Sequence, residues 1–182
     1  MEDRYLFKAK HFKKWHIGNI VKEPDGLYIR DIKENVMTYI NDESTICQCT
    51  GLKDKNGNLI WENDILMCYD NTDNLVKVAY GEFDVIDADS LNVSDSVIGW
   101  HHEVVSMDAL NKYELLRYDM LPLTEYYIQL MESKRIGNIF DNPELLESED
   151  SHNVVLNRVC YARGSSGTFV IDLNDSIETR DY

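Results

Sequence analysis

The sequence predicts a mainly β protein of the α+β class, with a few short helices and a β-hairpin extension at its C-terminal end. Short segments of the first half alternate apolar and polar residues, as half-buried strands do. Gly, Asn and Asp residues separate these segments, as tight turns require. Few stretches of the second half place apolar residues at helical spacing. Together these observations favour sheets as the main architecture.

The first predicted strands follow one another closely along the chain. They cover residues 5–8, 15–21, 27–30 and 36–40, and the turn Pro24-Asp25-Gly26 precedes the third. Asn56 and Gly57 then lie between apolar flanks. An Asn-Gly pair in that setting favours a type I′ hairpin turn, in which both central residues have positive φ.

Strands continue after this turn through Ile60 and residues 65–67. Val76, Val78 and Tyr80 alternate with polar residues, and Phe83 and Val85 continue the alternation with the opposite parity. A β-bulge or turn at Gly81-Glu82 would explain the change of parity. Residues 97–100 form one more predicted strand.

Three stretches of the second half indicate helices. Ser106 would cap a helix in which Leu110, Tyr113 and either Leu116 or Arg117 share a face. Residues 123–131 also fit helical spacing, through Leu123, Tyr126, Tyr127, Leu130 and Met131, although their Tyr and Ile content leaves a strand open. Asn142 as N-cap and Pro143 at the first helical position predict a short third helix, with Glu144 and Glu147 at its positive end.

The C-terminal part is predicted to form a separate extension. Residues 148–153 are a polar linker, and 154–162 and 168–173 would pair as a hairpin joined by 163–167. The last residues, 174–182, are polar and expected to fray. We therefore divide the chain into a β domain over 1–150 and an extension over 151–182.

Composition points to an acidic globular protein. The 182 residues carry a net charge of −15, and 43% of them are hydrophobic. This charge disfavours binding to nucleic acid phosphates and suits a partner with a basic surface. Residues 1–22 are locally basic and could pair with acidic segments of another subunit or simply face solvent; their cations are Arg4, Lys8, Lys10, Lys13, Lys14 and Lys22.

Location and redox state follow from what the sequence lacks. No apolar run approaches the roughly 20 residues of a membrane-spanning helix, and the start has no apolar signal segment, so we expect a cytoplasmic protein without membrane contact. Cys47, Cys49, Cys68 and Cys160 do not form the paired pattern of a zinc site. We interpret them as reduced, small buried residues.

Four segments resemble a known family. Residues 4–10 are similar to the opening strand of the YopX-like phage and prophage proteins, and Trp15 followed by Gly18 fits their next element. Residues 45–65 (here called the hallmark block) resemble the family pattern T-V-x-Q-x-T-G-L-x-D-K-N-G-x-x-I-y-E-G-D-I. Residues 135–146 resemble V-I-G-N-I-y-e-N-P-E-L-L. Asn63 replaces the Gly of E-G-D, so we expect Asn63 to adopt positive φ.

The resemblance implies a phage or prophage protein with an SH3-like or small-barrel β core that self-associates. It implies no catalytic residue, because the family has no established activity. We treat the matching positions as a candidate structural motif: Gln48, Thr50, Gly51, Asp54, Asn56, Gly57, Glu62, Asp64, Gly137, Asn138, Asn142, Pro143 and Glu144.

Within the hallmark block, Glu62 and Asp64 alternate after Trp61, so on a strand both carboxylates would point to one face. Such a pair could perform acid–base chemistry or bind a cation. We favour the alternative that they accept backbone N–H bonds from the 54–58 turn or from nearby strands.

His101 and His102 are adjacent, so on a strand they would face opposite ways and not chelate one metal together. Residues 164–167 suggest a hairpin loop rather than a phosphate cradle.

The sequence therefore predicts a non-enzymatic, self-associating protein-binding protein without cofactor or metal, acting on a host defence or replication protein through its acidic surface. One alternative is a nucleic-acid-associated small barrel, and another is a metal-dependent hydrolase using Glu62 and Asp64. Aromatic residues exceed what a small core needs, which favours a binding role. The candidate interaction residues are Trp15, Trp61, Trp100, Glu147, Glu149 and Asp150.

Overall fold

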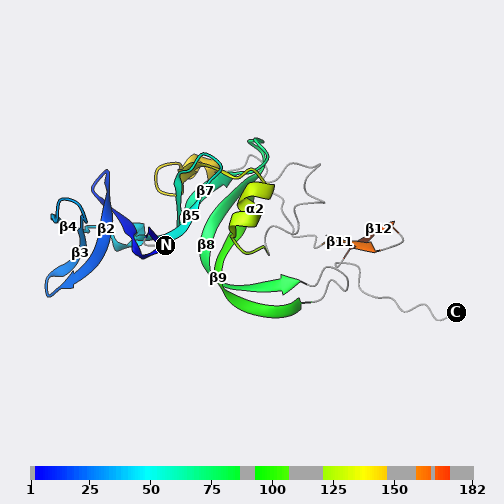
Figure 1. The fold of residues 1–182 in the computed structure, drawn as a ribbon, viewed down its shortest axis with the longest axis horizontal. Coiled ribbons are helices and arrows are strands. Elements are labelled where there is room, and N and C mark those ends of the chain that lie inside the picture. Colours follow the sequence, from blue (N-terminus) through cyan, green and yellow to red (C-terminus); the bar gives the residue numbers. More distant parts are fainter. Residues whose placement is uncertain (1–2, 87–92, 107–120, 147–158, 165–166, 173–182) are drawn as a thin grey trace.

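The computed structural model describes residues 3–86, 93–106, 121–146, 159–164 and 167–172. These residues form two antiparallel sheets, with strand orders β4-β3-β2-β1-β5-β6 and β10-β7-β8-β9, and a separate hairpin β11–β12. Figure 1 shows the first sheet in blue and cyan beside the second in green and yellow. The prediction of a mainly β protein is confirmed.

The first sheet is built from the N-terminal third of the chain. Its strands are β1 (Phe7–His11), β2 (Lys14–Glu23), β3 (Gly26–Arg30), β4 (Met37–Tyr39), β5 (Cys47–Lys53) and β6 (Leu59–Trp61), and the short 3₁₀ turns η1 (Asp3–Tyr5) and η2 (Glu43–Thr45) flank them. Strand β2 changes partner at Gly18, which pairs with Phe7 of β1, whereas Asn19 pairs with Arg30 of β3. A Cβ at Gly18 would overlap the carbonyl oxygen of Arg30, so only glycine permits this approach.

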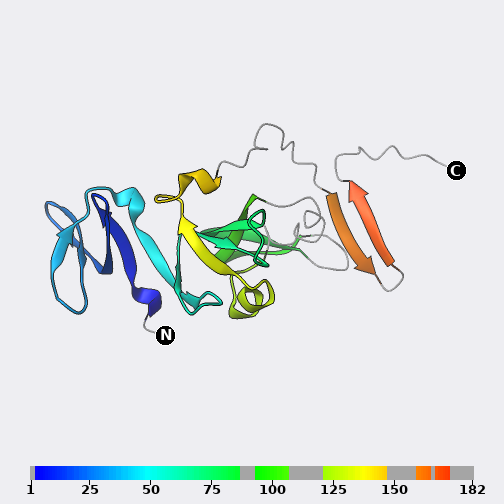
Figure 2. The same cartoon turned by 90° about the horizontal axis from the view of Figure 1, so that it is seen from above.

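The second sheet contains β7 (Asp64–Met67), β8 (Leu75–Ile86), β9 (Val93–Ser106) and β10 (Lys134–Asn138). Helix α2 (Glu125–Leu130) packs on one face over Ile60, Leu66, Val76 and Val78, and η4 (Pro143–Leu146) covers part of the other face. β8 and β9 extend past the helix as a long two-stranded arm (Figure 1), and in the view from above β10, in yellow, lies in front of them (Figure 2). The sheet therefore has an apolar core on both faces near β7 and a less covered arm.

The expected SH3-like barrel is not present in the described residues. Both sheets are open, with β4 and β6 at the ends of one and β10 and β9 at the ends of the other. The physical reason lies at Glu62 and Asn63, where a turn carries the chain from β6 in the first sheet to β7 in the second. Asn63 has φ 62°, which confirms the expected positive φ at this position.

The hairpin turn after β5 differs from the predicted type I′. The N–H of Gly57 donates to the carbonyl of Asp54 at 2.9 Å, and Gly57 has φ 83°, but Asn56 is not in the positive-φ region. This is the pattern of a type I turn followed by a left-handed glycine. This turn forms in place of type I′ because the Asp54 carboxylate accepts the N–H groups of Asn56 and Asn58, at 2.9 and 2.8 Å, and so stabilises the wider loop.

No bulge occurs at Gly81-Glu82. Strands β8 and β9 pair regularly there, with Gly81 opposite Gly99, and the register shifts lie at the two ends of the ladder. The parity of buried residues changes because the paired glycines leave room on one face. The rings of Phe83 and His101 fill it, with centroids 4.8 Å apart.

The helix predicted at 123–131 is confirmed as α2, and the strand alternative is wrong. Thr124 caps it by accepting the N–H of Tyr127. The buried face is Leu123, Ile128 and Met131, whereas Tyr126 and Leu130 are exposed, because the helix has only six residues between its cap and the turn at Met131.

The C-terminal hairpin is confirmed as β11 (Val159–Gly164) paired with β12 (Gly167–Asp172). The helix predicted from Ser106, the linker 148–153 and the tail 174–182 lie outside the described residues, and the division at residue 150 stays a prediction. Cys47, Cys49 and Cys68 are buried, as expected, and none of these three forms a disulfide within the described residues.

Candidate functional site

The hallmark block lies where the two sheets meet, and its polar side chains hold that junction together. Asp54 is 5% exposed, and its carboxylate also accepts the N–H of Arg135 on β10 at 3.0 Å. Burial raises the pKa of Asp54, but its hydrogen bonds from Asn58, Arg135 and Asn56 outweigh this effect and bring the pKa below its usual value. Asp54 thus joins the turn after β5 to the second sheet.

Glu62 and Asp64 do not converge on one face as the strand pattern predicted. Glu62 lies in the turn between β6 and β7 and accepts the backbone N–H of Gln48 at 3.2 Å. Asp64 is fully buried and accepts the N–H of Trp61 at 2.9 Å. The alternative that these carboxylates cap nearby strands is therefore confirmed, although neither of them caps the 54–58 turn.

Asp64 also forms a buried ion pair across the junction. The ammonium of Lys8 on β1 lies 2.5 Å from Asp64 Oδ1, and the Lys8 side chain is 6% exposed. Its Nζ lies 4.9 Å from the ring centroid of Trp15 and 5.6 Å from that of Trp61. Burial raises the pKa of the Asp64 carboxyl, and the charge of Lys8 opposes that change.

A second ion pair extends the same contact towards the surface. Lys10 Nζ lies 2.6 Å from Asp141 Oδ1, and the indole N–H of Trp15 donates to Asp141 Oδ2 at 2.6 Å. Although partial burial raises the pKa of Asp141, the hydrogen bonds from Lys10, Asn138 and Trp15 lower it to about 2. We call Lys8, Lys10, Trp15, Asp64 and Asp141 the junction clasp.

Residues 137–144 belong to the second motif, the resembling segment 135–146, and their hydrogen bonds hold Asp141 of the clasp in position. Asn138 Oδ1 accepts the N–H groups of Phe140 and Asp141, both at 3.0 Å, and its Nδ2 donates to Asp141. The amide oxygen of Asn142 accepts from the N–H of Asn138 rather than capping the following turn, and its Nδ2 donates to Glu144. Asn142 occupies the predicted N-cap position immediately before η4, where its backbone carbonyl accepts the N–H of Leu145 at 3.1 Å, while its side chain lies against Gly137.

The remaining motif residues have local structural roles. Thr50 donates to the carbonyl of Ile60 at 2.9 Å and accepts the N–H of Leu52, while Gln48 donates to the carbonyl of Arg4. Gly51 has φ 78°. Pro143 begins η4, a 3₁₀ turn of four residues. At Cys47, burial raises the pKa to about 11, so its thiol is a poor nucleophile at neutral pH.

A comparison with known protein families places most of the chain in one family. The family model described as YopX protein matches residues 14–147. The chain belongs to the YopX family. A search of the curated proteins found no match. The matched range contains the hallmark block, the second motif and the partners Trp15, Asp64 and Asp141, while Lys8 and Lys10 lie just before it.

The clasp partners of this YopX-family chain were not foreseen. The basic N-terminal segment was expected to pair between subunits or face solvent, but Lys8 and Lys10 pair with acids of the same chain. Nothing in the local pattern signals that Lys8 is buried, because its neighbour Ala9 points to the opposite face of the strand. No sequence pattern names the partner of Lys8, 56 residues away.

The candidate interaction residues of the YopX-family chain behave differently from one another. Trp61 is 4% exposed and packs with Cys47 and Cys49, so its assignment as an interaction residue is wrong. The Trp61 ring points into the core, where Trp15 and Phe140 also pack against this cluster. Trp15 and Trp100 are half-buried against core clusters. Glu147, Glu149 and Asp150 lie outside the described residues.

The two adjacent histidines face opposite sides of β9, as predicted. His101 packs on Phe83, whereas His102 is fully buried and neither of its ring nitrogens has a hydrogen-bond partner. Across the described ranges, no three His, Cys, Asp or Glu residues are grouped so that they could hold a metal ion. The described part of the chain also contains no helix with the length and apolar character needed to cross a membrane.

Exposed apolar side chains mark the outer surface of the β8–β9 arm and of α2. Tyr80 is 56% exposed and Ile98 is 72% exposed, and they lie on the face of the arm that also carries Trp100. Tyr80 packs edge-on against Trp100, with ring centroids 5.0 Å apart. On α2, Tyr126 and Leu130 are also exposed. These exposed side chains make the arm and α2 a candidate interaction surface.

Proposed function

We propose that this chain is a non-enzymatic, self-associating binding protein of phage or prophage origin, acting in the host cytoplasm on a protein with a basic surface, such as a host defence or replication factor. The observation that carries the proposal is the exposed apolar surface of the arm, around Tyr80 and Ile98. Exposed apolar side chains grouped with an aromatic anchor are typical of interfaces.

The engagement of the motif carboxylates supports the same proposal. Asp54, Glu62 and Asp64 all accept backbone N–H groups, and Asp64 is enclosed with Lys8. Groups held in this way stabilise the scaffold and leave recognition to the outer faces. The net charge of −15 favours a basic partner over an acidic one.

The test combines capture and light scattering. The tagged full chain is incubated with a bacterial lysate, retained proteins are identified, and the purified chain is analysed by size-exclusion chromatography with light scattering. We expect an oligomer and a retained basic protein whose binding weakens as salt rises, because exposed charges are screened. A monomer that retains no protein at low salt would contradict the proposal.

A further inference from the structure

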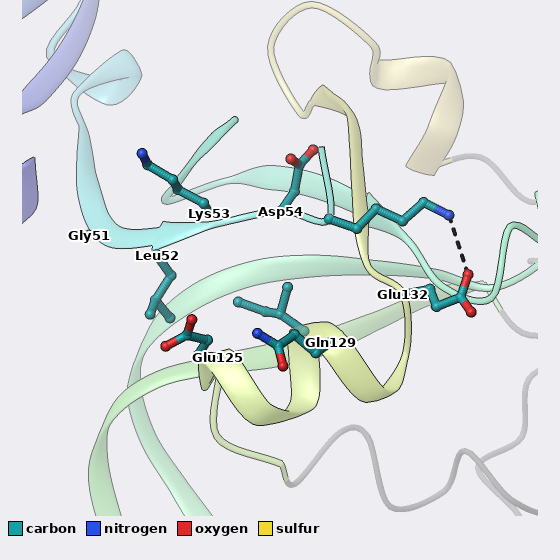
Figure 3. Close-up of a pocket in the computed structure, with 9 residues that line it drawn as sticks. Gly51, Leu52, Lys53, Asp54, Glu125, Gln129 and Glu132 are labelled. Carbon is teal, nitrogen blue, oxygen red and sulfur yellow. Dashed lines mark ion pairs between the residues drawn. The ribbon is translucent and has the colours of Figure 1, made fainter. Parts of the chain in front are cut away.

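A groove runs between the end of β5 and helix α2. It has a volume of about 530 Å³ and is lined by Gly51, Leu52, Lys53, Asp54, Lys55, Glu125, Ile128, Gln129 and Glu132. Figure 3 shows Leu52 pointing towards the helix, while the side chains of Lys53 and Asp54 point away from it. The two walls therefore contribute unequally: the strand supplies an apolar side chain, and the helix supplies most of the polar groups.

The floor of the groove is apolar. Leu52 is half-buried, Ile128 is 2% exposed, and both belong to the core cluster beneath α2. An apolar side chain seated on this floor would extend a core that already exists. Because removing apolar surface from water is favourable, such an anchor is a favourable starting contact.

The rim of the groove is acidic. Glu125 and Gln129 lie near Leu52, and Glu132 lies at the far end (Figure 3). No ion pair joins Glu125 to any other residue that the structure describes. Glu132 lies 3.5 Å from Lys55, but Lys55 is closer to Asp70, at 2.5 Å. Lys55 is therefore shared between Glu132 and Asp70, and the side chain of Lys53 points away from the groove (Figure 3), so the carboxylate charge of the rim is only partly offset.

We propose that this groove binds a short extended segment of a partner protein, in which an apolar side chain is flanked by lysine or arginine. Glu125 begins α2, and Glu132 follows the turn that ends it, where φ is 50°, so the two carboxylates lie towards opposite ends of the groove (Figure 3). The amide of Gln129, midway between them, can both donate to and accept from a peptide backbone.

This inference rests on the proposed function and names the partner chemistry at one place. Charge complementarity selects a basic segment over an acidic one, and the apolar floor selects a segment with an anchor over a run of cations. Gly51 closes one end of the groove, and a Cβ there would approach Arg4 at 3.0 Å, so the wall at that end is tightly packed.

The experiment uses two peptide probes on the isotope-labelled full chain. Acetyl-Ile-Arg-Ile-Arg-amide and acetyl-Ile-Glu-Ile-Glu-amide are titrated while backbone amide shifts are followed by NMR. We expect the arginine peptide to shift the amides of Leu52 and of residues 125–132, and the glutamate peptide to leave them unchanged. Raising the ionic strength from about 0.01 M to about 1 M, which shortens the Debye length from about 30 Å to about 3 Å, should weaken binding at least about fivefold.

Two charge-matched variants complete the test. Glu125→Lys should weaken binding of the arginine peptide at least about fivefold, whereas Glu34→Lys, with the same charge change at an exposed site between β3 and β4, should leave it within about twofold. Both variants should keep the wild-type spectrum elsewhere, because both positions are exposed. Equal binding of the two peptides, shifts located away from the groove, or equal effects of the two variants would overturn the inference.

Lysate capture separates this inference from the proposed function. If wild-type chain and Glu125→Lys retain the same protein equally well, the groove inference fails and the proposed function remains. If the arginine peptide binds the groove but the wild-type chain neither self-associates nor retains any protein, the proposed function fails and the groove inference remains.

Discussion

At the scale of single residues, Lys8 and Asp64 form the contact on which the junction depends most. Replacing Lys8 with Met leaves the fully buried carboxylate of Asp64 without its cation. We expect the free energy of unfolding to fall by about 3–5 kcal/mol, the usual cost of breaking a buried pair on one side. Urea denaturation monitored by circular dichroism measures this loss.

Two controls define the result. Lys10→Met removes a cation whose partner Asp141 is 39% exposed, so the loss should be only about 1 kcal/mol. The double variant Lys8→Met with Asp64→Asn, which removes both charges, should lose less than Lys8→Met alone. Equal small losses for Lys8→Met and Lys10→Met would show that the pair is not buried in solution.

His102 gives the fold a predicted pH dependence. Burial, and to a smaller extent the neighbouring His101, lower the pKa of His102 from 6.5 to about 4. Between pH 6.5 and pH 4 the unfolded chain therefore binds more protons at this position than the folded chain does. The contribution of a neutral His102 to stability is fully present above about pH 6.5 and is lost as the pH falls towards 4. Between pH 7 and pH 5 we expect a loss of about 2 kcal/mol from this group.

The variant that removes this titration is His102→Leu. Its free energy of unfolding should depend less on pH over the same interval, by about 2 kcal/mol, than that of the wild type. Urea denaturation at pH 7 and pH 5 compares the two chains. The same pH dependence in both would mean that His102 is solvated or hydrogen-bonded.

Single residues also show what the sequence could reveal. We expected Asn63 at positive φ because only Gly tolerates that region better, and the structure confirms it. This prediction needs only local backbone geometry. By contrast, the interaction role assigned to Trp61 was wrong, since the burial of an aromatic ring depends on which sheet faces it. That information is tertiary and does not appear in local spacing.

At the scale of elements, the close approach of Gly137 to Asn142 fixes how β10 leads into η4. A Cβ at Gly137 would overlap the amide of Asn142. Gly137→Ala should therefore lower the free energy of unfolding by about 1–3 kcal/mol, as overpacking does. Combining it with Asn142→Ala should cost less than the sum of the single changes, since the obstructing side chain is gone.

Gly57 is the matched control. It has φ 83°, and no atom lies within 4 Å of the Cβ that would be added there, so the cost of substitution is conformational only. Gly57→Asn should be tolerated better than Gly57→Ala, because Asn accepts positive φ more readily. Thermal denaturation ranks these variants. If the double variant lost as much stability as the two single variants together, the contact with Asn142 would not be the reason for a glycine at position 137.

Local patterns located most elements but not their partners. Helix α2, the strands of both sheets and the hairpin β11–β12 follow from alternation, helical spacing and capping. The barrel that the family resemblance implied is not present in the described residues, because closure depends on whether β6 and β7 stay in one sheet, and the turn at Glu62 and Asn63 separates them. The parity change in β8 was visible, yet its cause was the cross-strand pair Gly81–Gly99, which local spacing does not show.

At the scale of the whole molecule, the buried clasp and the exposed arm divide stability from recognition. Replacing both Tyr80 and Ile98 with Ser removes exposed apolar area while leaving the buried core intact. We expect the free energy of unfolding to change by no more than about 1 kcal/mol, since surface substitutions are mild. Self-association should weaken about tenfold or more if these residues are interface anchors, as sedimentation equilibrium would show.

The central claim is that the motif residues hold the two sheets together and the outer faces bind. The most direct measurement is the affinity of the retained partner for Lys8→Met and for the Tyr80→Ser, Ile98→Ser double variant, at a temperature where both are folded. We predict wild-type affinity for Lys8→Met, despite its lower stability, and a loss of about tenfold or more for the arm variant. Wild-type affinity in the arm variant together with lost binding in folded Lys8→Met would contradict this account.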